Sequence, residues 1–251
     1  MSKLPILKNA ADAPADATPS PEDQAFLEQE RLISTPEFLQ ALVEDKREEI
    51  AKMIVQDDRL VKSRDIAGAS AVQLAVYHGL DDMLGILLRS DVALDLAEAA
   101  AAGQLERVRE LLDEEPSTVD EPGGDGFTPL TLAATYGQTE VARALLDAGA
   151  DPSTPAQNPT RTAPIHGASG HIHAKTALEL VELLIERGAN VNAEQAGGFT
   201  ALHRAAGRGH AAVVKRLLDA GADRDTESDL GGTARELAEE RGHVPVMALL
   251  A

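Results

Sequence analysis

Three histidines lie close together in the chain and are the side chains best suited to chemistry. His166 is followed by His171-Ile172-His173, in which two imidazoles alternate along the backbone. Three neutral imidazoles are a ligand set for Zn²⁺ or another divalent cation. No cysteine and no obvious fixed carboxylate completes the set. One hypothesis for the function is therefore a metal-binding sensor or a metal-dependent enzyme, which we keep as the alternative to the binding function developed below. The competing interpretation is that His171 and His173 are solvated loop residues.

Other catalytic patterns are absent from the sequence. Ser169 lies in Gly167-Ala168-Ser169-Gly170, which lacks the second glycine and the preceding strand of a nucleophile elbow. There is no phosphate-binding loop and no His-Glu-x-x-His. With no cysteine, disulfides, thiolate zinc sites and cysteine nucleophiles are excluded. The sequence therefore predicts no enzyme and no cofactor.

The elements that must position these residues repeat along the chain. Gly126-Phe127-Thr128-Pro129-Leu130 recurs as Gly198-Phe199-Thr200-Ala201-Leu202. A step of 33 residues separates Gly188 from Gly221 and Gly209 from Gly242. Aromatic residues make up only 2% of the chain, which suits small helices packed through Ala and Leu. A repeat of this period predicts a stack of short helix pairs.

Each recurring residue has a local physical role. Thr128 and Thr200 are placed as N-caps, whose hydroxyls accept from free backbone donors. Pro129 stands at the first helical position, where its missing N–H costs nothing. Gly137 and Gly209 suit the left-handed residue that ends a first helix. Leu130, Ala133 and Ala134 give that helix a narrow apolar stripe, and Val141, Leu145 and Leu146 do so for the second helix.

These residues resemble the ankyrin-repeat family, whose pattern is Thr-Pro-Leu-His-x-Ala on the first helix and Gly-Ala-Asp after the second. The resemblance implies an all-α solenoid of antiparallel helix pairs with short projecting loops. Residues 1–34 include a stretch rich in Pro, Ala and Asp and are expected to be a flexible acidic leader with a short helix at Pro21–Ile33, while residues 35–251 form the repeat domain. The expected units are 35–64 (N-terminal cap), 65–91, 92–123, 124–156, 157–193, 194–226 and 227–251 (C-terminal capping repeat).

Two units depart from the regular spacing. Gly79 and Gly103 are only 24 residues apart, so the loop between their units should be missing or very short. The unit at 157–193 has four added residues, expected between its two helices within Ala168–Ala177. A longer turn there predicts the weak point of the stack.

The resemblance also implies where a partner binds, because projecting loops and first helices line a concave groove in this family. Aromatic residues and arginines are enriched at interface hot spots. The predicted partner-binding residues are Tyr77, Phe127, Tyr136, Arg161, Phe199, Arg204 and Arg208. The alternative for the two Phe residues is packing on a neighbouring loop. Structural roles in packing and turns are expected for His166, His203, His210 and His243.

The formal net charge of −19 favours a basic or neutral protein partner and disfavours nucleic acid. Pro5 interrupts a short N-terminal apolar run, and no stretch has the length of a membrane span. We therefore expect another protein as partner, no nucleic acid and no membrane, and a cytoplasmic monomer that does not catalyse a reaction.

Overall fold

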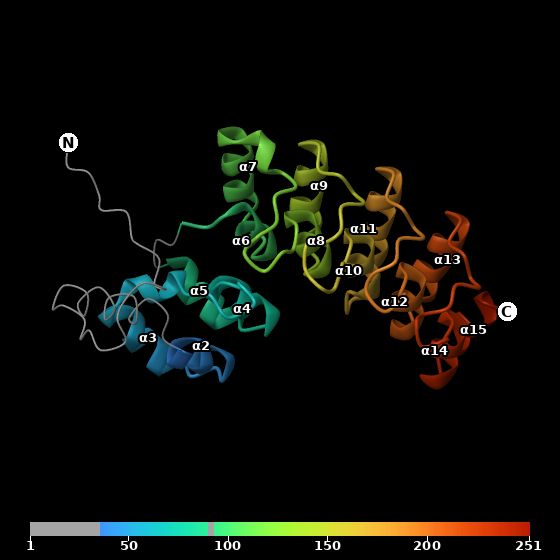
Figure 1. The fold of residues 1–251 in the computed structure, drawn as a ribbon, viewed down its shortest axis with the longest axis horizontal. Helices are drawn as coiled ribbons and strands as arrows, with labels where there is room; N and C mark the ends of the chain where they lie inside the picture. The colour runs from blue at the N-terminus through green and yellow to red at the C-terminus, as the bar shows by residue number, and fades with distance from the viewer. Residues whose placement is uncertain (1–35, 90–92) are drawn as a thin grey trace, which may run out of the picture.

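The computed structural model describes residues 36–89 and 93–251, which form seven successive antiparallel helix pairs (Figure 1). The all-α solenoid is confirmed. The predicted leader, 1–34, and its helix lie outside the described residues. The first and second helices of the pairs are α2 (Pro36–Val43) and α3 (Arg47–Gln56), α4 (Ala71–Tyr77) and α5 (Asp81–Arg89), α6 (Leu96–Ala101) and α7 (Leu105–Glu114), α8 (Pro129–Thr135) and α9 (Thr139–Asp147), α10 (Pro164–Gly170) and α11 (Ala174–Glu186), α12 (Ala201–Arg208) and α13 (Ala211–Asp219), and α14 (Ala234–Glu240) and α15 (Val244–Leu249). Two short 3₁₀ helices, Asp58–Lys62 and Pro116–Thr118, follow α3 and α7.

Helix starts follow the predicted chemistry at one threonine and depart from it at another. The Thr128 hydroxyl accepts from the Thr131 N–H at 3.2 Å, so the predicted N-cap of α8 is confirmed. Thr200 is also the N-cap residue of α12, as predicted, but its N–H and its hydroxyl are directed toward Nδ1 of His203, at 3.2 and 2.9 Å. A ring nitrogen three residues into the helix therefore replaces the acidic partner of a capping box.

Helix ends use left-handed glycines as predicted. Gly137 follows α8 with φ of 75°, and Gly209 follows α12 with the same φ. This conformation lets the chain reverse at once into the second helix.

The pairs stack so that like helices lie beside like. Along the regular part of the array, α7, α9, α11 and α13 form one row, and α6, α8, α10, α12 and α14 form the other (Figure 1). Leu130, Ala133 and Leu145 are fully buried in a core that runs through the stack. Alanines in this stripe let neighbouring helices approach closely, so no pair buries its apolar face alone.

Successive projecting loops are joined by equivalent backbone hydrogen bonds. The carbonyls of Gly126, Thr160 and Gly197 each accept an N–H from the next loop, at 2.7, 2.9 and 2.9 Å. Only two isolated antiparallel bridges occur among the described residues, Arg64 with Ser70 and Glu227 with Thr233. Successive loops are thus joined by one backbone hydrogen bond at each of these junctions rather than by a sheet.

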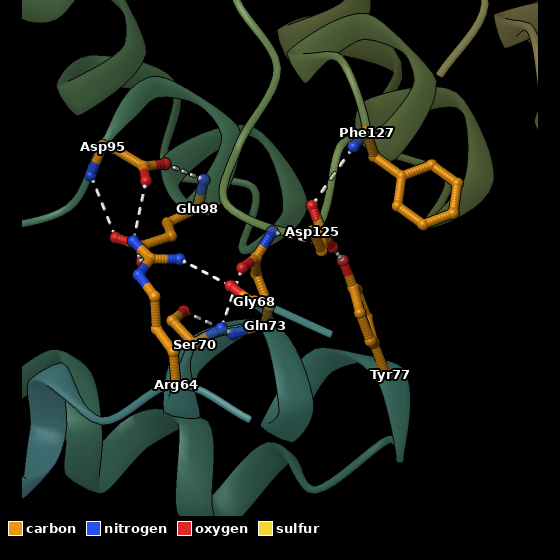
Figure 2. Close-up of polar contacts among 9 residues, drawn as sticks. All are labelled: Arg64, Gly68, Ser70, Gln73, Tyr77, Asp95, Glu98, Asp125 and Phe127. Carbon is orange, nitrogen blue, oxygen red and sulfur yellow. Dashed lines mark hydrogen bonds and ion pairs between the residues drawn. The ribbon is translucent and has the colours of Figure 1, made fainter. Parts of the chain in front are cut away.

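The connection between the second and third pairs is short, as the spacing predicts. Six residues, 90–95, separate α5 from α6, whereas fourteen, 115–128, separate α7 from α8. Arg64 bridges this junction: its guanidinium donates to Glu98 at 2.9 Å, to Asp95 at 3.1 Å and to the Gly68 carbonyl at 3.0 Å (Figure 2). A side-chain network replaces the contacts that a full-length loop makes elsewhere.

The four added residues of the fifth pair lie in a helix rather than in a turn. α11 has 13 residues and α9 has 9, while three residues join the helices in both pairs, 171–173 and 136–138. Four residues are about one helical turn. The prediction of a lengthened turn is therefore wrong, and with it the reason for expecting a weak point there.

Candidate functional site

Two of the predicted binding residues come from pairs that are not adjacent in sequence. Tyr77 at the end of α4 and Tyr136 at the end of α8 stack with ring centroids 5.4 Å apart and planes 9° from parallel. The intervening helix α6 contributes two alanines, Ala97 and Ala101, which are buried and belong to the same apolar cluster as the two rings. Phe127 joins the same apolar cluster. The small side chains of α6 are what allow the two tyrosines to meet across it.

A buried carboxylate is hydrogen-bonded to two members of this aromatic cluster, Tyr77 and Phe127. Asp125 accepts a hydrogen bond from the Tyr77 hydroxyl, from Nε2 of Gln73 at 3.1 Å and from the Phe127 N–H at 3.2 Å (Figure 2). Burial, then the hydrogen bond to Asp125, raises the pKa of Tyr77. Burial, then the charge of Asp125, raises the pKa of Tyr136. Both phenols therefore stay neutral, and they present half-buried ring faces to solvent rather than free side chains.

Next to this cluster the surface is hollowed along the first helices. One cavity of about 560 Å³ is lined by Tyr77 and Tyr136 at one end and by Arg204 and Arg208 at the other. A second cavity, of about 450 Å³, shares both arginines and continues to Phe199 and Arg241. We call the two adjoining cavities the groove; it crosses α4, α8, α10, α12 and α14.

The phenylalanines take different parts in this surface. Phe199 lies edge-on to the His203 ring, with centroids 5.6 Å apart, at the mouth of the second cavity. Phe127 covers the cluster from the side of its loop and lines neither cavity. The sequence left open whether both Phe residues only pack on neighbouring groups. Phe127 does so, whereas Phe199 also lines a cavity.

One predicted residue stands apart, and one lining residue escaped prediction. Arg161 is exposed in the loop before α10, with φ of 49°, and lines neither cavity. Arg241 lines the second cavity, although the sequence placed this residue only within the C-terminal capping repeat, 227–251. The signal was available, because Arg241 follows Arg208 by one 33-residue step and so takes the same place in its pair.

His166 serves the fold rather than a metal ion. Its ring is fully buried, Nδ1 accepts the Ala163 N–H at 3.0 Å, and Nε2 donates to the Ala193 carbonyl at 2.8 Å. Both nitrogens are thus engaged, and burial lowers the pKa of His166. His203 does the same one pair later, binding Thr200 and the Gly232 carbonyl, the latter at 3.1 Å.

The other two histidines of the motif lie outside the core but do not converge with His166 on a common point. His171 and His173 have ring centroids 5.5 Å apart, and Nδ1 of His171 accepts the His173 N–H at 3.1 Å. The His171 carbonyl accepts from Nε2 of His210 at 2.8 Å, which ties two pairs together. Within 36–89 and 93–251, no group of three or more His, Asp or Glu side chains could hold a metal ion. The geometry gives the metal-site alternative no support.

Ser169 is equally unsuited to act as a nucleophile. It is fully buried in α10, and its hydroxyl has no hydrogen-bond partner among the residues that the structure describes. A hydroxyl without a base beside it and without access to solvent cannot attack a substrate.

Comparison with known proteins identifies the family to which the repeat pattern belongs. A family model described as ankyrin repeats (3 copies) matches residues 93–156 and 165–251, which together are more than half of the chain. The chain belongs to the ankyrin-repeat family. The ankyrin-repeat pattern of this chain therefore includes the capping histidines, His166 and His203, and the glycines that end the first helices. The first two helix pairs lie outside the matched residues.

Two ankyrin-repeat relatives show how far the likeness extends. The chain is 36% identical over 117 residues to the ankyrin repeat, SAM and basic leucine zipper domain-containing protein 1 of Saimiri boliviensis boliviensis. It is 32% identical over 109 residues to the ankyrin repeat and SAM domain-containing protein 6 of Rattus norvegicus. The matches cover 47% and 43% of this chain, but only 24% and 12% of those relatives. The chain thus spans about a quarter or less of the length of these relatives.

Ankyrin repeats indicate a protein–protein interaction module, and another protein is the kind of partner they suggest. None of the helices in the described ranges has both the length and the apolar character needed to cross a membrane.

Proposed function

We propose that this chain is a non-catalytic recognition module that binds another protein in the groove. The proposal rests on one observation: predicted binding residues from separate helix pairs lie together on one surface. Tyr77, Tyr136, Phe199, Arg204 and Arg208 line two cavities that share a wall. Aromatic rings and guanidinium groups in a hollow are the usual anchors of a protein interface.

The proposed binding surface is preorganised. Tyr77 stacks on Tyr136 and is hydrogen-bonded to Asp125, and the groove is built on helix ends rather than on long loops. A surface that is already ordered loses little conformational entropy when a partner binds. We extend the proposal to a monomer acting in the cytoplasm, as expected from the sequence.

A photo-crosslinking amino acid tests which face binds. Ile172 is 65% exposed and lines the groove, whereas Val244 is 67% exposed at the start of α15 and lines neither cavity. Each is replaced in turn by p-benzoylphenylalanine, and the full chain is irradiated in an extract of its native cells. We expect position 172 to yield a discrete crosslinked protein that position 244 does not. The same protein captured equally from both positions, or from 244 alone, would contradict the proposal.

A further inference from the structure

The charge of the groove is opposite to that of the whole chain. The formal net charge is −19, with 42 Asp and Glu against 23 Lys and Arg. The lining of the two groove cavities nevertheless includes Arg204, Arg208 and Arg241 and no Asp or Glu. Two other hollows of the described surface are different: Glu114 and Glu121 line one, and Asp113 and Glu140 line the other. The lining of the groove thus differs from these hollows in having no acidic side chain.

The arginines of the groove are also left without counter-charges. Most arginines on the outer surfaces pair with carboxylates, such as Arg143 with Glu140 and Arg187 with Asp147. Among the described residues, no carboxylate forms an ion pair with Arg204, Arg208 or Arg241. Arg204 and Arg208 are four residues apart on α12, where two like charges repel. Loss of hydration in the groove, and then the charge of Arg208, lower the pKa of Arg204.

Two of the groove arginines lie against glycines of a neighbouring first helix. The Arg241 guanidinium donates to the Gly207 carbonyl at 2.8 Å. Arg204 lies beside Gly170, where a Cβ built on the glycine would be 3.7 Å from Nε of Arg204. In both cases the arginine follows the glycine by 34 residues in the sequence. Arg204, Arg208 and Arg241 are all exposed to solvent and line the same cavity.

We propose that the groove recognises an acidic peptide segment of its partner, whose carboxylates pair with Arg204, Arg208 and Arg241. This inference rests on the proposed function, and it specifies the chemistry of the partner at the same site. Guanidinium groups bind carboxylates with two parallel hydrogen bonds, which gives orientation as well as affinity. The tyrosine end of the groove, with the exposed Ile172, offers an apolar subsite beside the charged one.

An acidic peptide fits this setting better than a nucleic acid or an anionic membrane. The charge screening length is roughly 8 Å at physiological salt, so a short peptide in the groove responds to the arginines around it. A duplex or a lipid surface extends far beyond the groove and meets the acidic remainder of the molecule. The chain-wide charge predicts a basic or neutral partner, but the local charge of the groove decides what binds inside it.

The test begins with an unbiased probe. A random dodecapeptide library displayed on phage is selected on the immobilised full chain at about 0.15 M salt. The most enriched sequence is then made with a fluorescein label, together with a version in which every Asp and Glu is replaced by Asn and Gln. Binding is measured by fluorescence anisotropy to the wild type, to Arg208→Gln and to the double variant Arg204→Gln/Arg208→Gln. Arg143→Gln, on the outer face of α9, is the matched control, and thermal melts monitored by circular dichroism establish that each variant is folded.

We expect selected peptides to be enriched in Asp and Glu. The amide version and the double variant should each bind about tenfold more weakly, with Arg208→Gln intermediate and Arg143→Gln unchanged. Selected peptides without acidic residues that compete for the groove would overturn the acidic chemistry and leave the proposed function standing. Acidic peptides unaffected by Arg208→Gln, or tighter binding of an oligothymidylate or phosphatidylserine vesicles, would also overturn it. A selection that enriches no peptide would also overturn the acidic chemistry. The crosslinking experiment at position 172 would then test the proposed function separately.

Discussion

Replacing Asp125 by Ala should uncouple the first helix pairs from the rest of the stack. Asp125 lies in the loop before α8, yet its carboxylate accepts from Gln73 and Tyr77 of α4, bypassing the third pair. Gln73 is fully buried, so its amide would have no acceptor in the variant. A buried donor left unsatisfied costs roughly 1–3 kcal/mol, and a hydrogen bond to a charged group contributes roughly 1.5–3 kcal/mol.

Two effects make the expected loss of stability smaller than the sum of these two contributions. Tyr77 and Phe127 are half-buried, so water can replace part of what they lose, and removing the carboxylate relieves the cost of burying it. We therefore expect the free energy of unfolding to fall by about 2–4 kcal/mol. Because a stack is held by contacts between neighbours, the weakened junction should also broaden the urea transition or split it.

The assay is urea unfolding followed by circular dichroism, combined with a double-mutant cycle between Asp125→Ala and Tyr77→Phe. Groups in direct contact show coupling of roughly 0.5–3 kcal/mol. The matched control is Asp147→Ala, which removes an exposed ion pair with Arg187 and should cost less than about 1 kcal/mol. Strict additivity in the cycle, or a loss no larger than that of the control, would refute the reasoning.

Three further predictions concern the core, the helix contacts and pH. Leu145→Ala, at a fully buried position, should lower the free energy of unfolding by about 2–5 kcal/mol, measured by urea titration. Gly167→Ala should destabilise by about 1–2 kcal/mol, because a Cβ there would overlap the Thr135 hydroxyl and crowd its backbone, whereas Gly170→Ala should stay within about 1 kcal/mol of wild type; equal thermal melts would count against this packing. Burial lowers the pKa of His166, so its contribution to stability is present above pH 6.5 and is lost as the pH falls toward the folded pKa. The loss is at most about 1.4 kcal/mol per pH unit for one proton, and His166→Asn should flatten the dependence of stability on pH below 6.5, with an unchanged slope as the contrary result.

The sequence was sufficient for the local rules of this fold. Thr128 and Gly137 bound a first helix through interactions within a few residues, and Leu145 follows a helical apolar stripe. Such features are readable because their causes lie within one helix pair. The added residues of α11 were misplaced, since a longer helix and a longer turn give the same spacing between flanking motifs.

The site was predicted less completely than the fold. The stacking of Tyr77 on Tyr136 depends on the alanines of α6 between them and on the short connection before it. No local pattern in the sequence encodes a contact across an intervening pair. Arg241 was missed for another reason, because it lies in the unit expected to be a capping repeat, and its 33-residue equivalence to Arg208 was not used.

Hydrogen exchange on the complex shows whether a partner protein occupies the groove. Backbone amides are compared with and without the protein captured from position 172. We expect slower exchange at the ends of the first helices, in segments 135–138, 170–173 and 207–210, with no change along α9 and α13. Slower exchange confined to α9, α11 and α13, with the groove segments unchanged, would contradict the proposed function.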